Sequence, residues 1–254
     1  MAGNNHVFLL TSLVLRDFRI RYRSMSLGVF WSLLNPLVMM GVLTFIFTRI
    51  FPESRSHNLH LSILSGLVLF NFFSLSWSAG TVSLLDSAGL IKRVPMPRVW
   101  IPVSAVLSNT IHLLIQIGLL LLLVVVAGIG VNIHWLLLPW ILAMEVMFVC
   151  GLCLITSALH VYFRDVRYVV ESAIMVLFWM VPVVYSFEMI PARYHSLYWY
   201  NPVAAVVIAC RSVLLEGRMP APETLAKLTA VSVVVFTLGL VWFQRLRHRF
   251  ADYV

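Results

Sequence analysis

Two ionisable side chains that lie in otherwise uncharged, apolar segments are the strongest candidates for chemistry in this chain. Glu145 lies inside the apolar segment 135–161, and Arg211 lies in the short apolar run that follows Asn201-Pro202. An isolated charge at the centre of a bilayer costs about 2.5–3.5 kcal/mol, so Glu145 should face a pore, pair with a cation or carry a proton. We predict an ion pair with Arg211, and we weigh it equally against a protonated or helix-bonded glutamate that holds the bundle together.

Large aromatic rings form a second group of candidates. Phe70, Phe73 and Trp77 fall on one face of a helix over 60–85. Such rings can stack on the apolar faces of sugars along a channel, but packing against helices or lipid is the more frequent role of any single ring. Four further rings in neighbouring apolar segments belong to the same group: Phe30, Trp31, Trp179 and Tyr185.

The N-terminal segment 5–23 must position four arginines. Read as a helix, it carries an apolar stripe at spacings of three and four residues, and Arg16, Arg19 and Arg23 lie on a different face. Such a helix lies along a membrane surface. It either braces a soluble partner against the bilayer or only orients the first span, and the pattern supports both interpretations equally. The arginines are Arg16, Arg19, Arg21 and Arg23, and the stripe is Val7, Leu10, Val14, Phe18 and Tyr22.

Composition assigns residues 1–254 to a single integral membrane domain. Hydrophobic residues make up 61% of the chain, charged residues make up 11%, and the mean hydropathy is +0.95. A soluble domain has about 25% charged residues and could not bury this much apolar surface. The chain has a net charge of +8. Its charged residues lie between the apolar runs, so membrane topology explains the charge better than nucleic-acid binding does. Cys150 and Cys153 lie in an apolar helix without further ligands nearby, which favours packing over a metal site.

Six apolar runs predict an all-α protein with six transmembrane helices. The turn at 128–132 divides the longest uncharged run, and Pro36 and Pro182 should kink their helices. Twelve of the 18 lysines and arginines fall on one side, in the N-terminal helix, in the loops after the second and fourth spans and at the C-terminus. The positive-inside rule makes that side cytoplasmic and predicts that both termini lie there. The predicted spans are 26–49, 60–85, 99–127, 135–161, 168–187 and 226–244.

Residues 189–222 are too apolar for a loop and too interrupted for a span. Asn201-Pro202 predicts a helix start, and Glu216-Gly217 predicts its end. Thirteen residues at 1.5 Å each reach about 20 Å, which is too short for a crossing. We therefore predict a pair of short re-entrant or interfacial helices on the extracytoplasmic side. Irregular backbone at this depth favours a gate or exit vestibule.

Taken together, the chain resembles the permease subunits of type-2 ABC exporters for polysaccharides and polyol phosphates, a group that includes O-antigen, capsule and teichoic acid permeases. The match covers nearly the whole chain in the expected order and is specific as a set. The residues that carry it are Arg16-Asp17, Arg21-Tyr22-Arg23-Ser24, Leu27-Gly28-x-x-Trp31, Asn35-Pro36, Leu90-Ile-Lys92-Arg93-Val-Pro-Met-Pro97-Arg98, Tyr162-Phe163-Arg164-Asp165, Tyr200-Asn201-Pro202 and Phe250-Ala-Asp252.

The resemblance implies a homodimer around a central conduit in a bacterial inner membrane, paired with two separate ATPase subunits. Segment 5–23 would rest on the ATPase, loop 86–98 would hold the coupling helix, and segment 189–222 would form the gate. The carried substrate would be a glycan or polyol phosphate on a lipid carrier, and Arg21 and Arg23 are candidates to receive its pyrophosphate. The implied ATPase contacts are Arg16, Arg19, Arg23, Lys92, Arg93 and Arg98.

Energy should come from another polypeptide. The chain contains no Gly-Lys dipeptide and so no phosphate-cradling loop, and we expect it to bind no cofactor, with ATP and Mg²⁺ on the partner subunit. Three alternatives stay open. One is an ABC permease that exports a drug or small lipid, and another is an intramembrane enzyme that acts on a polyprenyl lipid through Glu145 with His112 or His160. The third and weakest is a passive channel, since no span resembles a selectivity filter.

Overall fold

The structure, a computed structural model, describes residues 2–22, 28, 30–50, 58–93, 96–185, 191, 193, 198 and 201–246. Within these residues all regular structure is helical, and no strand occurs. The predicted all-α class is therefore confirmed. The helices are α1 (Ala2–Tyr22), α2 (Phe30–Phe45) with its π-helical extension η1 (Ile46–Ile50), α3 (Leu59–Asp86), α4 (Ala88–Arg93), α5 (Trp100–Val126), the 3₁₀ turn η3 (Ile133–Leu137), α6 (Leu138–Tyr162), α7 (Val166–Met180), α9 (Pro202–Leu214) and α10 (Pro222–Leu246).

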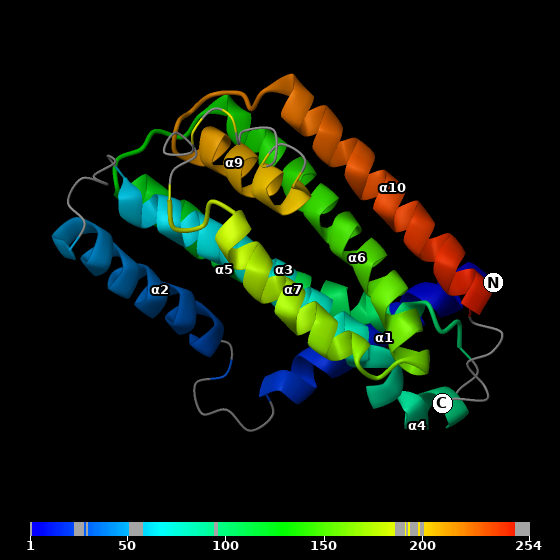
Figure 1. The fold of residues 1–254 in the computed structure, drawn as a ribbon. Coiled ribbons are helices and arrows are strands. Elements are labelled where there is room, and N and C mark those ends of the chain that lie inside the picture. The colour runs from blue at the N-terminus through cyan, green and yellow to red at the C-terminus, as the bar shows by residue number, and fades with distance from the viewer. Residues whose placement is uncertain are drawn as a thin grey trace.

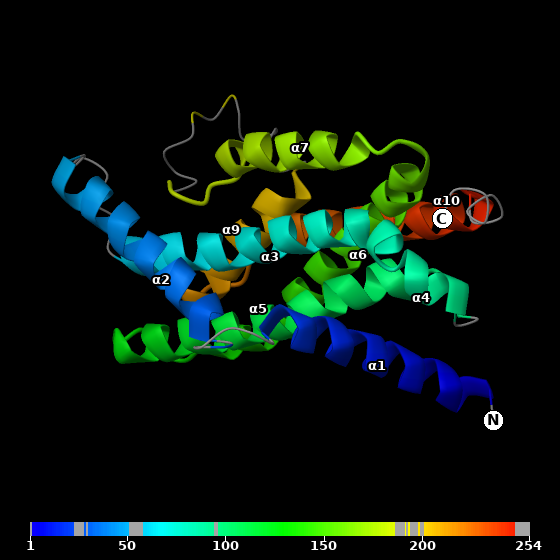
Figure 2. The ribbon, with the colours of Figure 1, turned by 90° about the horizontal axis from the view of Figure 1, so that it is seen from below.

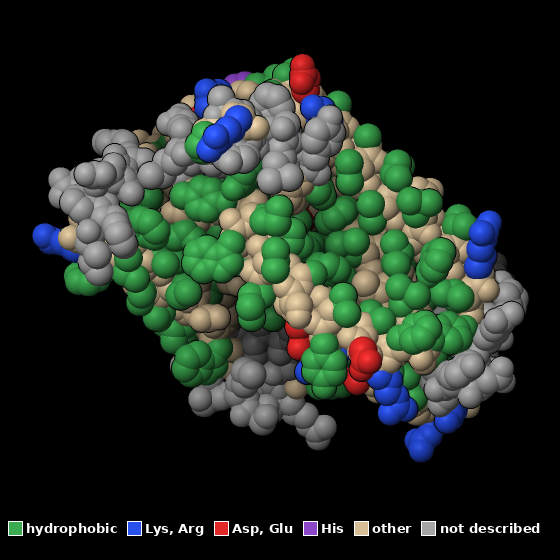
Figure 3. Space-filling view, in the orientation of Figure 1, with side chains coloured by type: hydrophobic (Ala, Val, Ile, Leu, Met, Phe, Trp, Pro, Cys, Tyr) green, Lys and Arg blue, Asp and Glu red, His purple; other side chains and the backbone are tan. Residues whose placement is uncertain are grey.

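Five helices in the described part of the chain are long and apolar enough to cross a membrane. Each begins and ends within four residues of a predicted span, because length and hydropathy are properties of the local sequence. They are Phe30–Arg49, Leu59–Asp86, Trp100–Val126, Ile133–Tyr162 and Pro222–Leu246. Charged side chains lie at the two ends of the face in Figure 3, and hydrophobic side chains cover its middle.

The remaining predicted span, 168–187, is shorter than expected. Helix α7 has 15 residues, which extend about 22 Å at 1.5 Å per residue. The predicted kink at Pro182 is wrong, because the helix ends at Met180 and Val181 adopts an extended conformation with ψ 136°. A proline disfavours helical backbone in the residue before it, and its ring nitrogen has no hydrogen to continue the helical bonding. A sixth crossing stays a prediction.

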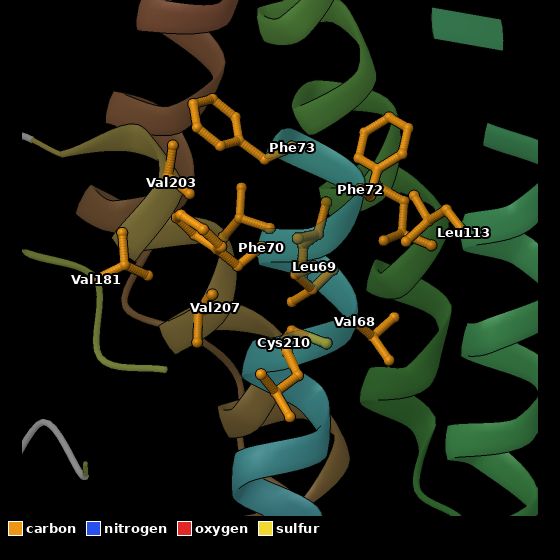
Figure 4. Close-up of a cluster of buried hydrophobic side chains, with 14 of the residues drawn as sticks. Val68, Leu69, Phe70, Phe72, Phe73, Leu113, Val181, Val203, Val207 and Cys210 are labelled. Carbon is orange, nitrogen blue, oxygen red and sulfur yellow. The ribbon is translucent and has the colours of Figure 1, made fainter. Parts of the chain in front are cut away.

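Helix α3 forms the centre of the bundle, with α5, α6, α7 and α9 packed around it. In Figure 2, α7 and α1 lie on opposite sides of α3. Buried residues occur around the full circumference of α3, as expected for a helix that is apolar on all sides. Figure 4 shows its side chains Phe70 and Phe73 beside Val203 and Val207 of α9.

Helices α6 and α10 pack closely against each other at two glycines. A Cβ atom on Gly239 would lie 2.5 Å from the carbonyl oxygen of Gly151, and a Cβ on Gly151 would lie 2.7 Å from backbone atoms of Val235 and Phe236. Small residues let helix backbones pack closely within a membrane. The contact between these helices therefore depends on the absence of side chains at both positions.

The predicted N-terminal helix is present, and its second half packs against α5. Leu13 is buried, Asp17 Oδ2 accepts a hydrogen bond from Ser104 Oγ at 3.2 Å, and the Phe18 ring stacks on His112 with centroids 5.1 Å apart. The bundle does not cover the beginning of the predicted apolar stripe, since Val7 is 65% exposed, which suits a helix that lies along a membrane surface. The helix diverges from α5 before that point (Figure 2), and Arg23 lies outside the described residues.

Candidate functional site

The bundle has two chemically different ends, which we name by the short helices they carry. The α4 end holds α4, the α1–α5 contact and the end of α10, and the α9 end holds α9 and the start of α10 (Figure 1). The α4 end corresponds to the predicted ATPase contact, and the α9 end corresponds to the predicted gate.

Helix α9 has the predicted start, length and end. The Asn201 side chain accepts hydrogen bonds from the backbone N–H groups of Val203 and Ala204, Pro202 occupies the first turn, and Gly217 adopts a positive φ of 64° just after the helix. These are the usual start and stop signals of a helix. The other predicted helix of the pair falls mainly on residues outside the described ranges.

Arg211 is buried in the last turn of α9 and joins three segments. Its guanidinium donates to the Ser62 carbonyl from Nη2 at 2.8 Å and from Nε at 3.2 Å, to Ser65 Oγ at 3.4 Å, to the Val183 carbonyl at 2.9 Å and to the Tyr185 carbonyl at 3.1 Å. Ser62 and Ser65 belong to α3, and the other two carbonyls belong to the non-helical segment after α7. Arg211 therefore fastens this segment to the core.

The predicted ion pair between Glu145 and Arg211 is wrong. Both carboxyl oxygens of Glu145 are buried without a hydrogen-bond partner, and the Arg211 donors are directed to backbone carbonyls and a serine. A buried carboxyl group without a partner is far less costly when it carries a proton. The protonated glutamate, which we weighed as the alternative, is the interpretation that fits this site.

Substitution should show that these two residues act independently. We expect the losses of stability in Glu145→Gln and Arg211→Gln to add in the double variant to within about 0.5 kcal/mol, since they share no bond. The measurement is thermal unfolding of the four purified proteins in one detergent. A coupling energy above about 1 kcal/mol between the two substitutions would support the ion pair after all.

The aromatic candidates divide into buried and exposed rings. Phe70, Phe73 and Trp77 are at most 9% exposed, and Phe73 stacks on Phe148 while Phe70 meets Phe178 edge-on. Their prediction as conduit candidates is wrong, because they pack inside the subunit. The exposed rings are Phe30 and Trp31 on α2 and Trp179 on α7. Tyr185 is half-buried, and its hydroxyl group forms hydrogen bonds with the Tyr198 hydroxyl and the Trp179 carbonyl.

The basic candidates at the α4 end also differ in their surroundings. Arg19, Lys92 and Arg93 are exposed, and the last two terminate α4, a short helix inside the predicted coupling loop. Arg16 forms an ion pair with Asp17 at 2.7 Å, and Arg98 is partly buried. The Arg21 side chain and Arg23 lie outside the described parts. A cleft of about 560 Å³ lies between α1 and the helices α3, α4 and α5, and its charged lining residues are Arg16, Asp17 and Asp86.

Comparison with known proteins identifies the class of this bundle. The family described as ABC-2 type transporter matches residues 9–215, which run from α1 to the end of α9. The chain belongs to the ABC-2 type transporter family. It is a multi-pass membrane protein, as the apolar helices independently indicate.

Three relatives are similar to this ABC-2 transporter chain over almost its whole length. An O-antigen export system permease protein RfbA of Klebsiella pneumoniae is 30% identical over 245 residues, which cover 96% of this chain and 94% of the relative. A protein of the same name from Myxococcus xanthus is 29% identical, with the same coverage. The polysialic acid transport protein KpsM of Escherichia coli is 26% identical over 92% of this chain and 91% of its own length.

Sequence reasoning missed the acceptors of Arg211 in the ABC-2 transporter chain. Ser62, Val183 and Tyr185 contribute backbone carbonyls, which every residue possesses, so residue type carries no signal for them. Gly66 gave the only local indication. A glycine within an apolar helix suggests a close approach of another segment, and the segment after α7 passes there.

Proposed function

We propose that the chain is the membrane permease of an ATP-driven exporter that moves a lipid-linked polysaccharide out of the cytoplasm. Its end-to-end similarity to permeases named for O-antigen export, and to a transport protein named for polysialic acid, carries the proposal. O-antigen and polysialic acid are both polymers of sugars, and the family match supports an ABC transport system. Transport, and not catalysis, is the activity we assign to the chain.

We assign the contact with two separate ATPase subunits to the α4 end, which we take as cytoplasmic. Arg19, Lys92 and Arg93 are exposed there, on the two elements that the sequence predicted for this contact. Arg16 contributes less directly, since Asp17 already neutralises its charge. ATP and Mg²⁺ would bind to the partner subunits.

We also propose that two copies of the chain form the conduit. Only 6% of the apolar stretch of α2 is buried, and α7 exposes Met175, Val176 and Trp179. Helices this apolar need lipid or protein around them, and a second copy would cover the two faces together. Phe30, Trp31 and Trp179 are then the rings that can face the conduit.

In this proposal the lipid carrier of the substrate bears a negatively charged pyrophosphate, which the protein can recognise. Arg21 lies in the last turn of α1, and Arg23 comes directly after this helix in the sequence. We place both at the cytoplasmic side, where a lipid-linked pyrophosphate would arrive. A guanidinium group binds phosphate oxygens in a bidentate manner, which suits this role. The proposed location is the bacterial inner membrane, with both termini in the cytoplasm.

A deletion strain tests the proposal. We expect finished polymer on its carrier to accumulate at the cytoplasmic face and the cell surface to lose the glycan, both restored by the wild-type gene on a plasmid. The measurement is fractionation followed by immunodetection of the glycan in each fraction. Normal surface glycan without a trapped intermediate, in a strain with no second permease of this class, would overturn polysaccharide export in favour of a drug or small lipid.

A further inference from the structure

The non-helical segment 181–185 has an unusual position for irregular backbone. Its residues Val181, Val183 and Val184 are at most 6% exposed, although they follow a helix of a membrane protein. Buried backbone carbonyls away from water must find hydrogen-bond donors within the protein. In the part of the chain that the structure describes, Arg211 supplies them to Val183 and to Tyr185.

Helix α7 depends on this attachment. Val170 is the one buried residue among its 15, and five further side chains, Phe178 among them, are only partly buried against the core, so a single face of α7 holds it to the bundle. Its C-terminal end continues directly into segment 181–185, and Figure 4 shows Val181 beside Phe70 and Val207 in the core. The fastening of the segment therefore also fixes the end of α7.

Gly66 of α3 makes the close approach of the segment possible. A Cβ atom at this position would lie 2.9 Å from Cα and the carbonyl oxygen of Val183 and 3.0 Å from Nη2 of Arg211. Both the segment and the guanidinium group thus occupy space that any other residue would fill. This gives a second way to disturb the contact without changing Arg211.

The hydrogen-bond acceptors around the positively charged guanidinium group of Arg211 are all neutral. Its acceptors are three carbonyls and one hydroxyl group, and it forms no ion pair with the described residues. When the site opens to water, the guanidinium can exchange these acceptors for water, and the released segment carries no charge that must be compensated. The contact is suited to repeated opening.

We propose that Arg211 is a positioning residue that latches segment 181–185, and with it the end of α7, to α3 and α9. Release of this latch opens the α9 end of the conduit during transport. The inference rests on the proposed function, because it requires a conduit, but it is independent of which substrate the conduit carries.

Passive leakage tests the latch. The permease–ATPase complex is reconstituted into liposomes that contain carboxyfluorescein, and dye efflux is recorded without ATP and without any glycan. We expect Arg211→Gln to leak about tenfold faster than the wild type, because each hydrogen bond from a charged donor is worth a factor of about ten. Arg211→Lys keeps the charge but loses the fork of donors, so it should leak at an intermediate rate.

Two further variants separate a latch from a merely structural role. Gly66→Ala displaces the segment while Arg211 remains, and it should leak as well. Gly118→Ala adds the same methyl group to α5, where a Cβ atom meets no other atom within 4 Å, so it should retain the wild-type rate. Thermal unfolding identifies the variants that fold.

Wild-type efflux in folded Arg211→Gln and Gly66→Ala would overturn the latch and leave polysaccharide export untouched. If Arg211→Gln does not fold, Gly66→Ala and Arg211→Lys decide the question by the same measurement. Faster efflux from Gly118→Ala equal to that of Gly66→Ala would also overturn the proposal, because the leak would then follow any added methyl group.

Discussion

Replacement of Gly239 by leucine is expected to destabilise the folded permease severely. The new Cβ atom would lie 2.5 Å from the carbonyl oxygen of Gly151 and 3.1 Å from its carbonyl carbon and Cα. All three are backbone atoms of α6, so no side-chain rotation can relieve the overlap. We expect a loss of about 3 kcal/mol, at the upper end for overpacked cores, which is a large part of the 5–15 kcal/mol that holds a typical domain together.

The measurement is the yield and unfolding temperature of the detergent-purified protein. Gly239→Leu should give little monodisperse protein, and Gly239→Ala should give protein with a lowered unfolding temperature. The matched control is Gly118→Leu, since a Cβ atom at Gly118 of α5 meets no other atom within 4 Å. Equal yields and unfolding temperatures for Gly239→Leu and Gly118→Leu would contradict the close α6–α10 contact.

Charge reversal on α4 should abolish export while the permease still folds. Lys92 and Arg93 are exposed at the end of this six-residue helix, so the double variant Lys92→Glu, Arg93→Glu leaves the core unchanged. Like charges brought together in an interface cost several kcal/mol. We expect surface glycan to fall at least about tenfold, which corresponds to about 1.4 kcal/mol, and the ATPase subunit to be lost during co-purification.

Arg49→Glu provides the control for this variant. Arg49 is exposed at the end of η1, and α2 ends away from α4 in Figure 1, so reversal of its charge should spare ATPase binding. Surface glycan is quantified with an antibody, and co-purification is read from the ratio of the two subunits. Normal export and normal ATPase recovery in the α4 double variant would show that α4 does not contact the ATPase subunit.

Several features followed from the sequence because they depend on neighbouring residues alone. Hydropathy located the long helices, since a span needs about 20 apolar residues in a row. Asn201, Pro202 and Gly217 bounded α9, because capping and left-handed backbone are local chemistry. The end of α7 near Pro182 was also available locally, as proline restricts the residue before it.

Helical periodicity could not decide which rings face the core. Phe70, Phe73 and Trp77 share a face, and so they were expected to act together, but periodicity does not say which neighbour covers that face. Packing with Phe148 and Phe178 buries them, whereas Phe30 and Trp31 on the splayed α2 stay exposed.

The partners of the two intramembrane charges were decided by the tertiary structure alone. The sequence determined that Glu145 and Arg211 lie in apolar helices and need compensation, because burial of a charge is costly wherever it occurs. Their similar expected depth suggested an ion pair. The acceptors of Arg211 instead come from carbonyls 26 to 149 positions away in the chain, and only the packing of α3, α9 and the segment after α7 brings them within reach of one guanidinium group.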